Sequence, residues 1–303
     1  MKAIIIGAGS DLGTHIDGAK FGPNVLIKDI KSTYDGQTVS MIQDPKYIKS
    51  RNLSDKRKNE DEIDKFNTKL YGIELDAIQK GYFPITLGGD HSIAVASAIA
   101  DCDYQEEDMG LIWIDAHTDY NTFDTTITGN IHGLPCAAIT GYKCEELRKF
   151  STKGRTIDPR KCVIVGARSI DPKEKENVKY SGVTVFSTED VKKRGVKEIM
   201  DEAFKIAGDK TKCIHVSYDL DVIDPEVAPG VSIPEVNGIS EKEAYDILDE
   251  VLKHYKEVSS MDIVELNPLR DINRKTEQIA LNILATTIAK IEKEKNVNQI
   301  KKY

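Results

Sequence analysis

Aspartate and histidine side chains are concentrated in two short segments of this sequence, at a spacing that suits metal binding. Asp115, His117 and Asp119 alternate just after one apolar run, and Asp219 and Asp221 follow another. Because alternate residues of an extended chain point to the same side, each segment is expected to direct its side chains one way. A lone aspartate at such a place usually caps a helix or lies in a turn, but two such segments together favour a shared metal site.

A sixth candidate ligand, His91, lies in the glycine-rich turn 88–92. Four carboxylates in one place cannot all remain ionised, because like charges a few ångströms apart raise each other's pKa. Four aspartates and two histidines can hold two divalent cations, with two carboxylates shared between them. Oxygen ligands with a minority of imidazoles suit Mn²⁺ better than structural zinc, which favours cysteine. Two ions lower the pKa of a shared water towards about 7, so the expected chemistry is hydrolysis of a planar, electrophilic carbon by the bridging hydroxide.

Short runs of apolar, β-branched residues are expected to form the strands that position these ligands. The expected strands are Ala3–Gly7, Phe83–Leu87, Gly110–Asp115, Lys161–Gly166, Val183–Phe186, Cys213–Asp219 and Val258–Val264. The expected helices lie between them, at Asp61–Gly81, Ser92–Ile99, Lys143–Phe150, Thr188–Ala207, Ser240–Tyr255 and Thr276–Lys293. This alternation predicts an α/β fold with a parallel sheet covered on both faces. In such folds the site lies at the carboxyl ends of the strands.

The composition narrows the class of protein. The chain has 303 residues and no linker rich in Pro, Gly or Ser, so we expect one domain over residues 1–303. The net charge of −8 argues against nucleic acid or an anionic membrane as a partner. No apolar run reaches the roughly 18 residues that a membrane span requires. The five cysteines lack CxxC spacing, and the first residues do not form a signal peptide, so we expect free thiols in a cytoplasmic protein.

Five motifs, taken in chain order, resemble those of the ureohydrolase family, which includes arginases, agmatinases and formimidoylglutamases. They are Gly-Gly-Asp-His-Ser at 88–92, Asp-Ala-His-Thr-Asp at 115–119, Gly-Asn-Ile-His-Gly at 129–133, Ser-Tyr-Asp-Leu-Asp at 217–221 and Glu-Leu-Asn-Pro at 265–268. The likeness extends over nearly the whole chain. It implies a three-layer α/β/α fold with a central, mostly parallel eight-stranded sheet, two Mn²⁺ ions per chain and a homo-oligomer, a trimer or hexamer.

The resemblance also implies a role for each site residue. One ion would take His91, Asp115, Asp119 and Asp219, and the other would take His117, Asp115, Asp219 and Asp221, so that Asp115 and Asp219 bridge. His132 would move a proton to the leaving amine, for which an imidazole with a pKa near the working pH is suited. Glu265 would pair with the planar guanidinium of a small-molecule substrate. Together with Asp119, these two residues form the expected catalytic set.

The choice of substrate depends on two further segments. Residues 119–130 resemble the arginase loop that binds an α-carboxylate, through Asn121 and Thr128, and residues 166–174 resemble the segment that faces the α-amino group, through Asp171 and Glu174. Either acid could instead cap the helix that follows Asp171. Ile233 departs from the arginase pattern, because a hydroxyl residue usually stands there. L-Arginine, hydrolysed to L-ornithine and urea, is the favoured substrate, and agmatine, other guanidino acids and formiminoglutamate are the alternatives.

Two other classes of function fit the sequence less well. The glycines of segment 7–13 resemble a dinucleotide-binding turn, which would indicate an NAD-dependent oxidoreductase, but their spacing is GxGxxxG, so the third glycine is one residue late. That reading also leaves the aspartates and histidines without a role. A non-catalytic metal-binding protein of the same fold is a second alternative, against which His132 and Glu265 argue.

Overall fold

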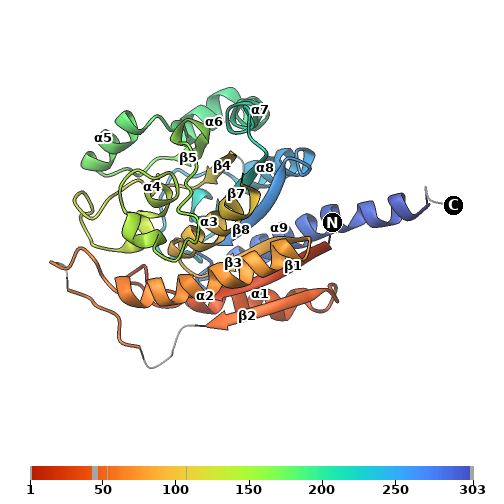
Figure 1. The fold of residues 1–303 in the computed structure, drawn as a ribbon, viewed down its shortest axis with the longest axis horizontal. Coiled ribbons are helices and arrows are strands. Elements are labelled where there is room, and N and C mark those ends of the chain that lie inside the picture. Colours follow the sequence, from red (N-terminus) through yellow and green to blue (C-terminus); the bar gives the residue numbers. More distant parts are fainter. Residues whose placement is uncertain (1, 43–46, 53, 107, 301–303) are drawn as a thin grey trace.

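The eight strands that the structure describes form one central sheet in which every neighbouring pair is parallel. The computed structural model describes residues 2–42, 47–52, 54–106 and 108–300. The strand order is β2-β1-β3-β8-β7-β4-β5-β6. The strands are β1 Lys2–Gly9, β2 Gln37–Ile42, β3 Tyr82–Gly88, β4 Met109–Ile114, β5 Cys162–Ala167, β6 Thr184–Ser187, β7 Cys213–Asp219 and β8 Val258–Val264. The expected parallel α/β sheet is therefore confirmed (Figure 1).

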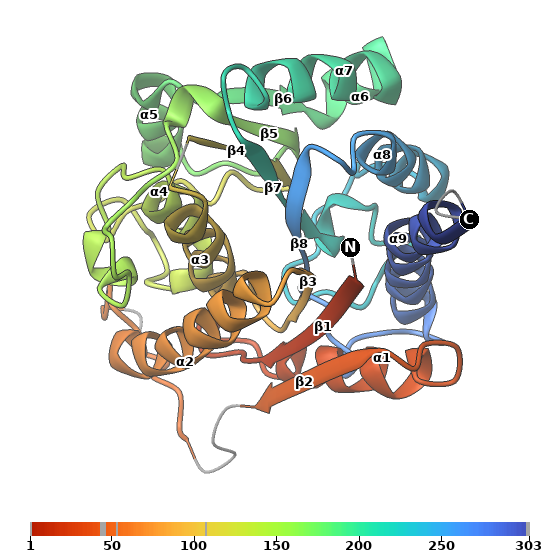
Figure 2. The same cartoon turned by 45° about the vertical axis from the view of Figure 1, so that its right-hand side comes forward.

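Helices cover both faces of the sheet and complete three layers. They are α1 Gly22–Ile30, α2 Glu60–Gln79, α3 Ala94–Gln105, α4 Pro135–Ile139, α5 Pro172–Ser181, α6 Thr188–Arg194, α7 Val196–Ala207, α8 Glu241–Lys253 and α9 Lys275–Ile300. Side chains of α1, α7, α8 and α9 pack into one apolar core, and those of α2, α3 and α4 into the other. Figure 2 shows the twisted sheet between these two layers. Ile5 belongs to the first core and its neighbours Ile4 and Ile6 to the second, because successive strand residues face opposite sides.

All seven expected strands are present, and an eighth, β2, was not expected. Strand β2 lies at the sheet edge and pairs only with β1. The helix expected over Thr188–Ala207 is divided at Gly195, which has φ 85° and separates α6 from α7. Only a short 3₁₀ turn, Glu145–Arg148, forms where Lys143–Phe150 was expected to be helical. Helix α1, which begins at Gly22-Pro23, was also missed.

The strand order brings the ligand-bearing segments together at one edge of the sheet. Strands β3, β8, β7 and β4 are consecutive neighbours, and His91, Glu265, Asp219 and Asp115 lie at or just beyond their carboxyl ends. Ile114 of β4 pairs with Tyr218 of β7, so the residues that follow them, Asp115 and Asp219, are level. Among the described residues, no helix is both long and apolar enough to cross a membrane.

Candidate metal and substrate site

One group of predicted ligands surrounds the imidazole of His91. Its Nδ1 lies 3.1 Å from Asp115 Oδ2, 3.3 Å from Asp119 Oδ2 and 3.0 Å from Asp219 Oδ2. These four side chains are buried, and His91 Nδ1 makes no hydrogen bond of acceptable geometry. Here a buried nitrogen faces three carboxylate oxygens and makes no hydrogen bond. A divalent cation fits between such atoms.

A second group of ligands lies around His117 and shares Asp115 with the first. His117 Nδ1 is 3.3 Å from Asp115 Oδ1 and 3.0 Å from Asp221 Oδ2. Asp115 therefore presents Oδ2 to the first group and Oδ1 to the second, which is the arrangement of a bridging carboxylate. Asp219 belongs to the first group, and the ligand atoms that cluster around His117 are those of Asp115 and Asp221.

The carboxylates of these two groups oppose one another's ionisation. Burial, followed by the negative charge of Asp115, raises the pKa of Asp119 well above its usual value. Burial and the charges of Asp221 and Asp115 do the same for Asp219. Asp115 itself keeps a lowered pKa, because the nearby imidazoles of His117 and His91 favour its ionised form and outweigh its burial. Divalent cations at this place would relieve the repulsion, as the sequence reasoning expected.

The ligands are directed by the loop after β4 rather than by the pleat of a strand. Strand β4 ends at Ile114, and Asp119 has a left-handed backbone with φ 48°. The carbonyl of Asp119 accepts a hydrogen bond from the backbone of Ala137 at 3.2 Å, which attaches the loop to α4. The side chains of 115, 117 and 119 all reach the site, as expected. The expected cause, the alternation of side chains along a strand, is wrong.

Two residues that had no predicted role hold the first group in place. The indole of Trp113 donates to Asp115 Oδ2 at 2.9 Å, and its ring stacks on His91 with centroids 3.9 Å apart. Ser217 Oγ lies 2.8 Å from His91 Nε2, so the other nitrogen, Nδ1, is turned to the carboxylates. Trp113 and Ser217 each precede a ligand by two residues on a strand, and that spacing is the sequence signal that could have identified them.

His132 and Glu265 form a pair beside the first group. Glu265 Oε1 accepts a hydrogen bond from the backbone of His91 at 3.0 Å and lies 3.0 Å from His132 Nδ1. Burial disfavours the protonated imidazole of His132, but the hydrogen bond and charge of Glu265 outweigh it and raise the pKa of His132. Glu265 Oε2 is buried and makes no hydrogen bond. The imidazole of His132 is therefore suited to carry a proton, and Glu265 Oε2 is left to accept a hydrogen bond.

A cavity of about 220 Å³ opens over these groups. The predicted residues that line it are His117, Asp119, Asn121, Thr128, His132, Asp171, Glu174, Asp219 and Asp221, and Ile233 lines it too. His91, Asp115 and Glu265 are not among the lining residues and are almost completely buried. The cavity therefore joins most of the predicted metal ligands to the residues expected to bind the amino acid end of a substrate.

Two acids that line the cavity, Asp171 and Glu174, differ in their exposure and in their hydrogen bonds. Glu174 is 4% exposed, and its oxygens accept hydrogen bonds from the backbone of Tyr120 and from Asn121 Nδ2, both at 2.9 Å. It also completes the capping box that begins at Asp171 and starts α5, as the alternative reading of these acids expected. Asp171 is more exposed and lies 3.2 Å from Asn121 Nδ2. Asp171 is thus the acid with more freedom to meet a ligand.

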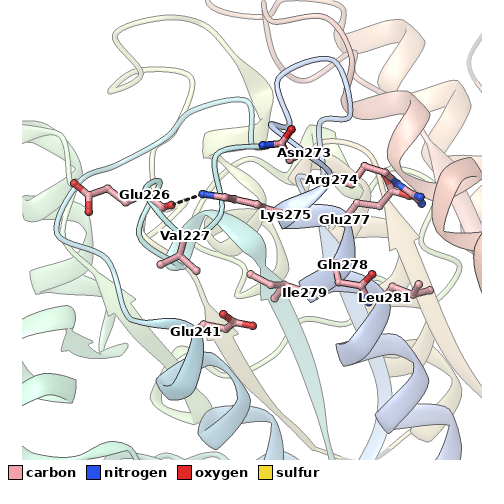
Figure 3. A pocket seen from close by; sticks show the side chains of 10 residues that line it. All are labelled: Glu226, Val227, Glu241, Asn273, Arg274, Lys275, Glu277, Gln278, Ile279 and Leu281. Carbon is pink, nitrogen blue, oxygen red and sulfur yellow. Dashed lines mark hydrogen bonds and ion pairs between the residues drawn. The ribbon is translucent and has the colours of Figure 1, made fainter.

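A larger hollow, of about 690 Å³, lies near the start of α9 and is shown in Figure 3. Its cations already have partners in the protein, because Lys275 Nζ donates to the carbonyl of Glu226 at 3.4 Å and Arg274 pairs with Glu277 at 2.5 Å. The described residues that line it include no histidine. Although it is larger, this hollow lacks the ligand set found in the 220 Å³ cavity.

Comparison with known proteins identifies the family to which this chain belongs. A model of the Arginase family matches residues 1–289 of the chain. The arginase of Bacillus caldovelox is 33% identical over 294 residues, covering 94% of this chain and 98% of the relative. The arginase of Bacillus subtilis (strain 168) is 34% identical over 299 residues, covering 94% and 97%.

Solved structures give the same result for the fold. The native structure of the Bacillus caldovelox arginase has a TM-score of 0.84 and 31% identity, and covers 94% of this chain and 97% of that one. The arginase of Entamoeba histolytica, solved in complex with L-ornithine, has a TM-score of 0.84 and 29% identity, and covers 93% and 97%. The chain therefore belongs to the arginase family and is a hydrolase of guanidino or amidino carbon–nitrogen bonds.

Proposed function

We propose that this protein is a manganese-dependent arginase, which hydrolyses L-arginine to L-ornithine and urea. The observation that carries the proposal is that two ligand groups share Asp115 and lie under the same cavity as the His132–Glu265 pair. His91, Asp115, Asp119 and Asp219 would hold one Mn²⁺, and His117, Asp115, Asp219 and Asp221 the other. Bound there, the two ions supply a hydroxide at neutral pH, because divalent cations lower the pKa of coordinated water.

The reacting end of the substrate is oriented by Glu265. Its Oε2 has no hydrogen-bond partner among the described residues, and a guanidinium offers N–H donors in a planar fork that suits a carboxylate. Holding the guanidinium in this way fixes its carbon near the ligand groups and lowers the entropic part of the barrier. His132 Nδ1 is bound to Glu265, so its ring is held in one orientation, and it transfers a proton to the departing amine of ornithine.

The cavity favours a cationic substrate. Six acids line it. The two ions would offset the charges of Asp119, Asp219 and Asp221, which leaves Asp171, Glu174 and Glu235, and no lysine or arginine is among the lining residues that the structure describes. A substrate with two carboxylates, such as formiminoglutamate, would be repelled by this field. Arginine places its amino group near Asp171 and Glu174 and its carboxylate near the neutral donors of Asn121 and Thr128. The relatives named as arginases, one of them solved with L-ornithine, support this choice.

An assay of urea release tests the proposal directly. The purified protein with added Mn²⁺ is compared on L-arginine, agmatine, guanidinobutyrate and guanidinopropionate, with formamide release from formiminoglutamate measured alongside. We expect the highest kcat/KM on L-arginine and almost none after His91→Ala. Preference for agmatine would move the assignment to agmatinase, and full activity without manganese in the presence of a chelator would contradict the proposal.

We further propose that the protein is cytoplasmic and assembles as a homo-oligomer, a trimer or hexamer, as other members of the family do. Size-exclusion chromatography with light scattering would measure the assembly directly, and a monomer at micromolar concentration would contradict it. Cell fractionation would test the location.

A further inference from the structure

Glu235 is a carboxylate of the cavity to which neither the ligand spacing nor the family motifs assign a role. It lies in the loop between β7 and α8, and its side chain is 31% exposed. Its Oε1 is 3.7 Å from His117 Nε2, which is within ion-pair reach but longer than a hydrogen bond. Glu235 is not one of the six predicted ligands, but it lies close to one of them, His117.

The two ring nitrogens of His117 have different neighbours, and the one near Glu235 is Nε2. Its Nδ1 faces Asp115 and Asp221, where the second ion would be held. A neutral imidazole that gives the lone pair of Nδ1 to a cation carries its proton on Nε2. In His117, this nitrogen lies 3.7 Å from Glu235 Oε1. Carboxylates that accept this second N–H of a metal-binding histidine fix the ring and strengthen it as a ligand.

Arg168 holds the loop of Glu235 in position. Its Nη2 donates to the carbonyls of Glu235 and Asp221, both at 2.8 Å. Its Nη1 donates to the carbonyl of Val222 at 3.0 Å and its Nε to that of Val236 at 3.0 Å. One guanidinium just beyond β5 therefore ties the segment that carries Glu235 to the segment that carries the ligand Asp221. The backbone of Glu235 is thus held close to His117, and its side chain is partly exposed.

The first ligand group is supported differently. His91 Nε2 lies against Ser217 Oγ, and Ser217 Oγ donates to Asp262 Oδ2 at 3.4 Å. These partners are buried and belong to the sheet, whereas Glu235 is partly exposed and belongs to a loop. The two imidazoles therefore have separate supports, and a change at Glu235 is expected to affect only one of them.

We propose that Glu235 is a positioning residue for the second ion, holding the His117 ring in the orientation that binds metal and so setting the affinity of that ion separately from the first. This inference rests on the proposed function, because it requires the site to hold two divalent cations. Loss of a comparable outer carboxylate costs about 10- to 100-fold in metal affinity in proteins. We expect the dissociation constant of the second ion to rise by about that factor in Glu235→Ala, and less in Glu235→Gln, whose amide oxygen still accepts a hydrogen bond.

The test is a metal titration of the full-length protein. Metal-free wild-type protein, Glu235→Ala and Glu235→Gln are titrated with Mn²⁺ by isothermal calorimetry, and the spin-coupled two-ion signal is followed by electron paramagnetic resonance. The control is Glu226→Gln, which removes one carboxylate from the same loop at an exposed position beside the hollow of Figure 3. The control should bind both ions as the wild-type protein does.

The outcomes separate this inference from the function on which it rests. Weaker second-ion binding in both variants, with unchanged first-ion binding, supports the inference and shows that the protein remains folded. Unchanged binding of both ions, or equal weakening of both, overturns it, since the second result would indicate a general structural role. A wild-type protein that binds fewer than two ions would count against the proposed function instead.

Discussion

Replacing Glu74 by glutamine should make the free energy of unfolding depend less on pH. Glu74 lies on α2 and is completely buried. Its Oε1 accepts a hydrogen bond from Thr86 of β3, and its Oε2 has no hydrogen-bond partner. Burial is the main cause that raises its pKa from 4.5 to about 8, and the negative charges of Asp262 and Asp101 add to it, while the Thr86 hydrogen bond opposes them. The native state thus keeps a proton that the unfolded chain releases.

The size of the effect follows from proton linkage. Below pH 4.5 the carboxyl group of Glu74 is protonated in both states and has no effect on the pH dependence of stability. Between pH 4.5 and about 8 the native state binds one proton more, so the free energy of unfolding falls as pH rises, by about 1.4 kcal/mol per pH unit. From pH 5 to pH 8 this amounts to roughly 3 to 4 kcal/mol. Glutamine keeps the size and the acceptor for Thr86 but cannot ionise, so this loss should disappear.

The measurement is urea unfolding of metal-free wild-type protein and Glu74→Gln at one protein concentration, followed by circular dichroism from pH 5 to pH 8. We expect the variant to gain the stated 3 to 4 kcal/mol relative to the wild-type protein across this range. The control is Asp76→Asn, an exposed position on the same helix, for which the difference from wild type should stay nearly constant. Parallel curves for wild type and Glu74→Gln would show that Glu74 is ionised in the folded protein and would refute the reasoning.

Three further predictions concern the site itself. Glu265→Gln should lower the pKa of His132, because the charge that favours the imidazolium is removed, and an NMR titration of the histidine ring would show the shift; an unchanged midpoint would mean that the pair is not formed in solution. Arg168→Lys should destabilise the protein by about 1–3 kcal/mol, since an ammonium cannot meet the carbonyls of Asp221, Val222, Glu235 and Val236 together, and a melting temperature equal to that of wild type would contradict this. Chelation should lower the melting temperature, because an ion present at 1,000 times its Kd stabilises the native state by about 4 kcal/mol. A melting temperature unaffected by chelator and by added Mn²⁺ would argue against a metal site.

Much of the fold could be predicted because its signals are local. Most of the strands are mainly apolar, as strands covered on both faces must be, and β4 and β5 are apolar throughout. Strand β2 was missed because it has no apolar run: Val39 and Met41 alternate with the polar Thr38 and Ser40. The division between α6 and α7 depends on the positive φ of Gly195, since a glycine within a helical pattern does not by itself show that the helix ends.

The amino-acid sequence by itself determined the ligand types and the chemistry that they can perform. Short motifs after buried strands carry Asp115 and Asp219, and parallel strands place their carboxyl ends at one edge of a sheet whatever the strand order. The resemblance implied which ligands share an ion, but the distances between their atoms were decided only by the tertiary structure, because the adjacency of β4 and β7 depends on strand order. The same is true of Glu235 beside His117 and of Glu265 bound to His132, because their contacts join residues far apart in the chain, and local spacing carries no information about such pairs.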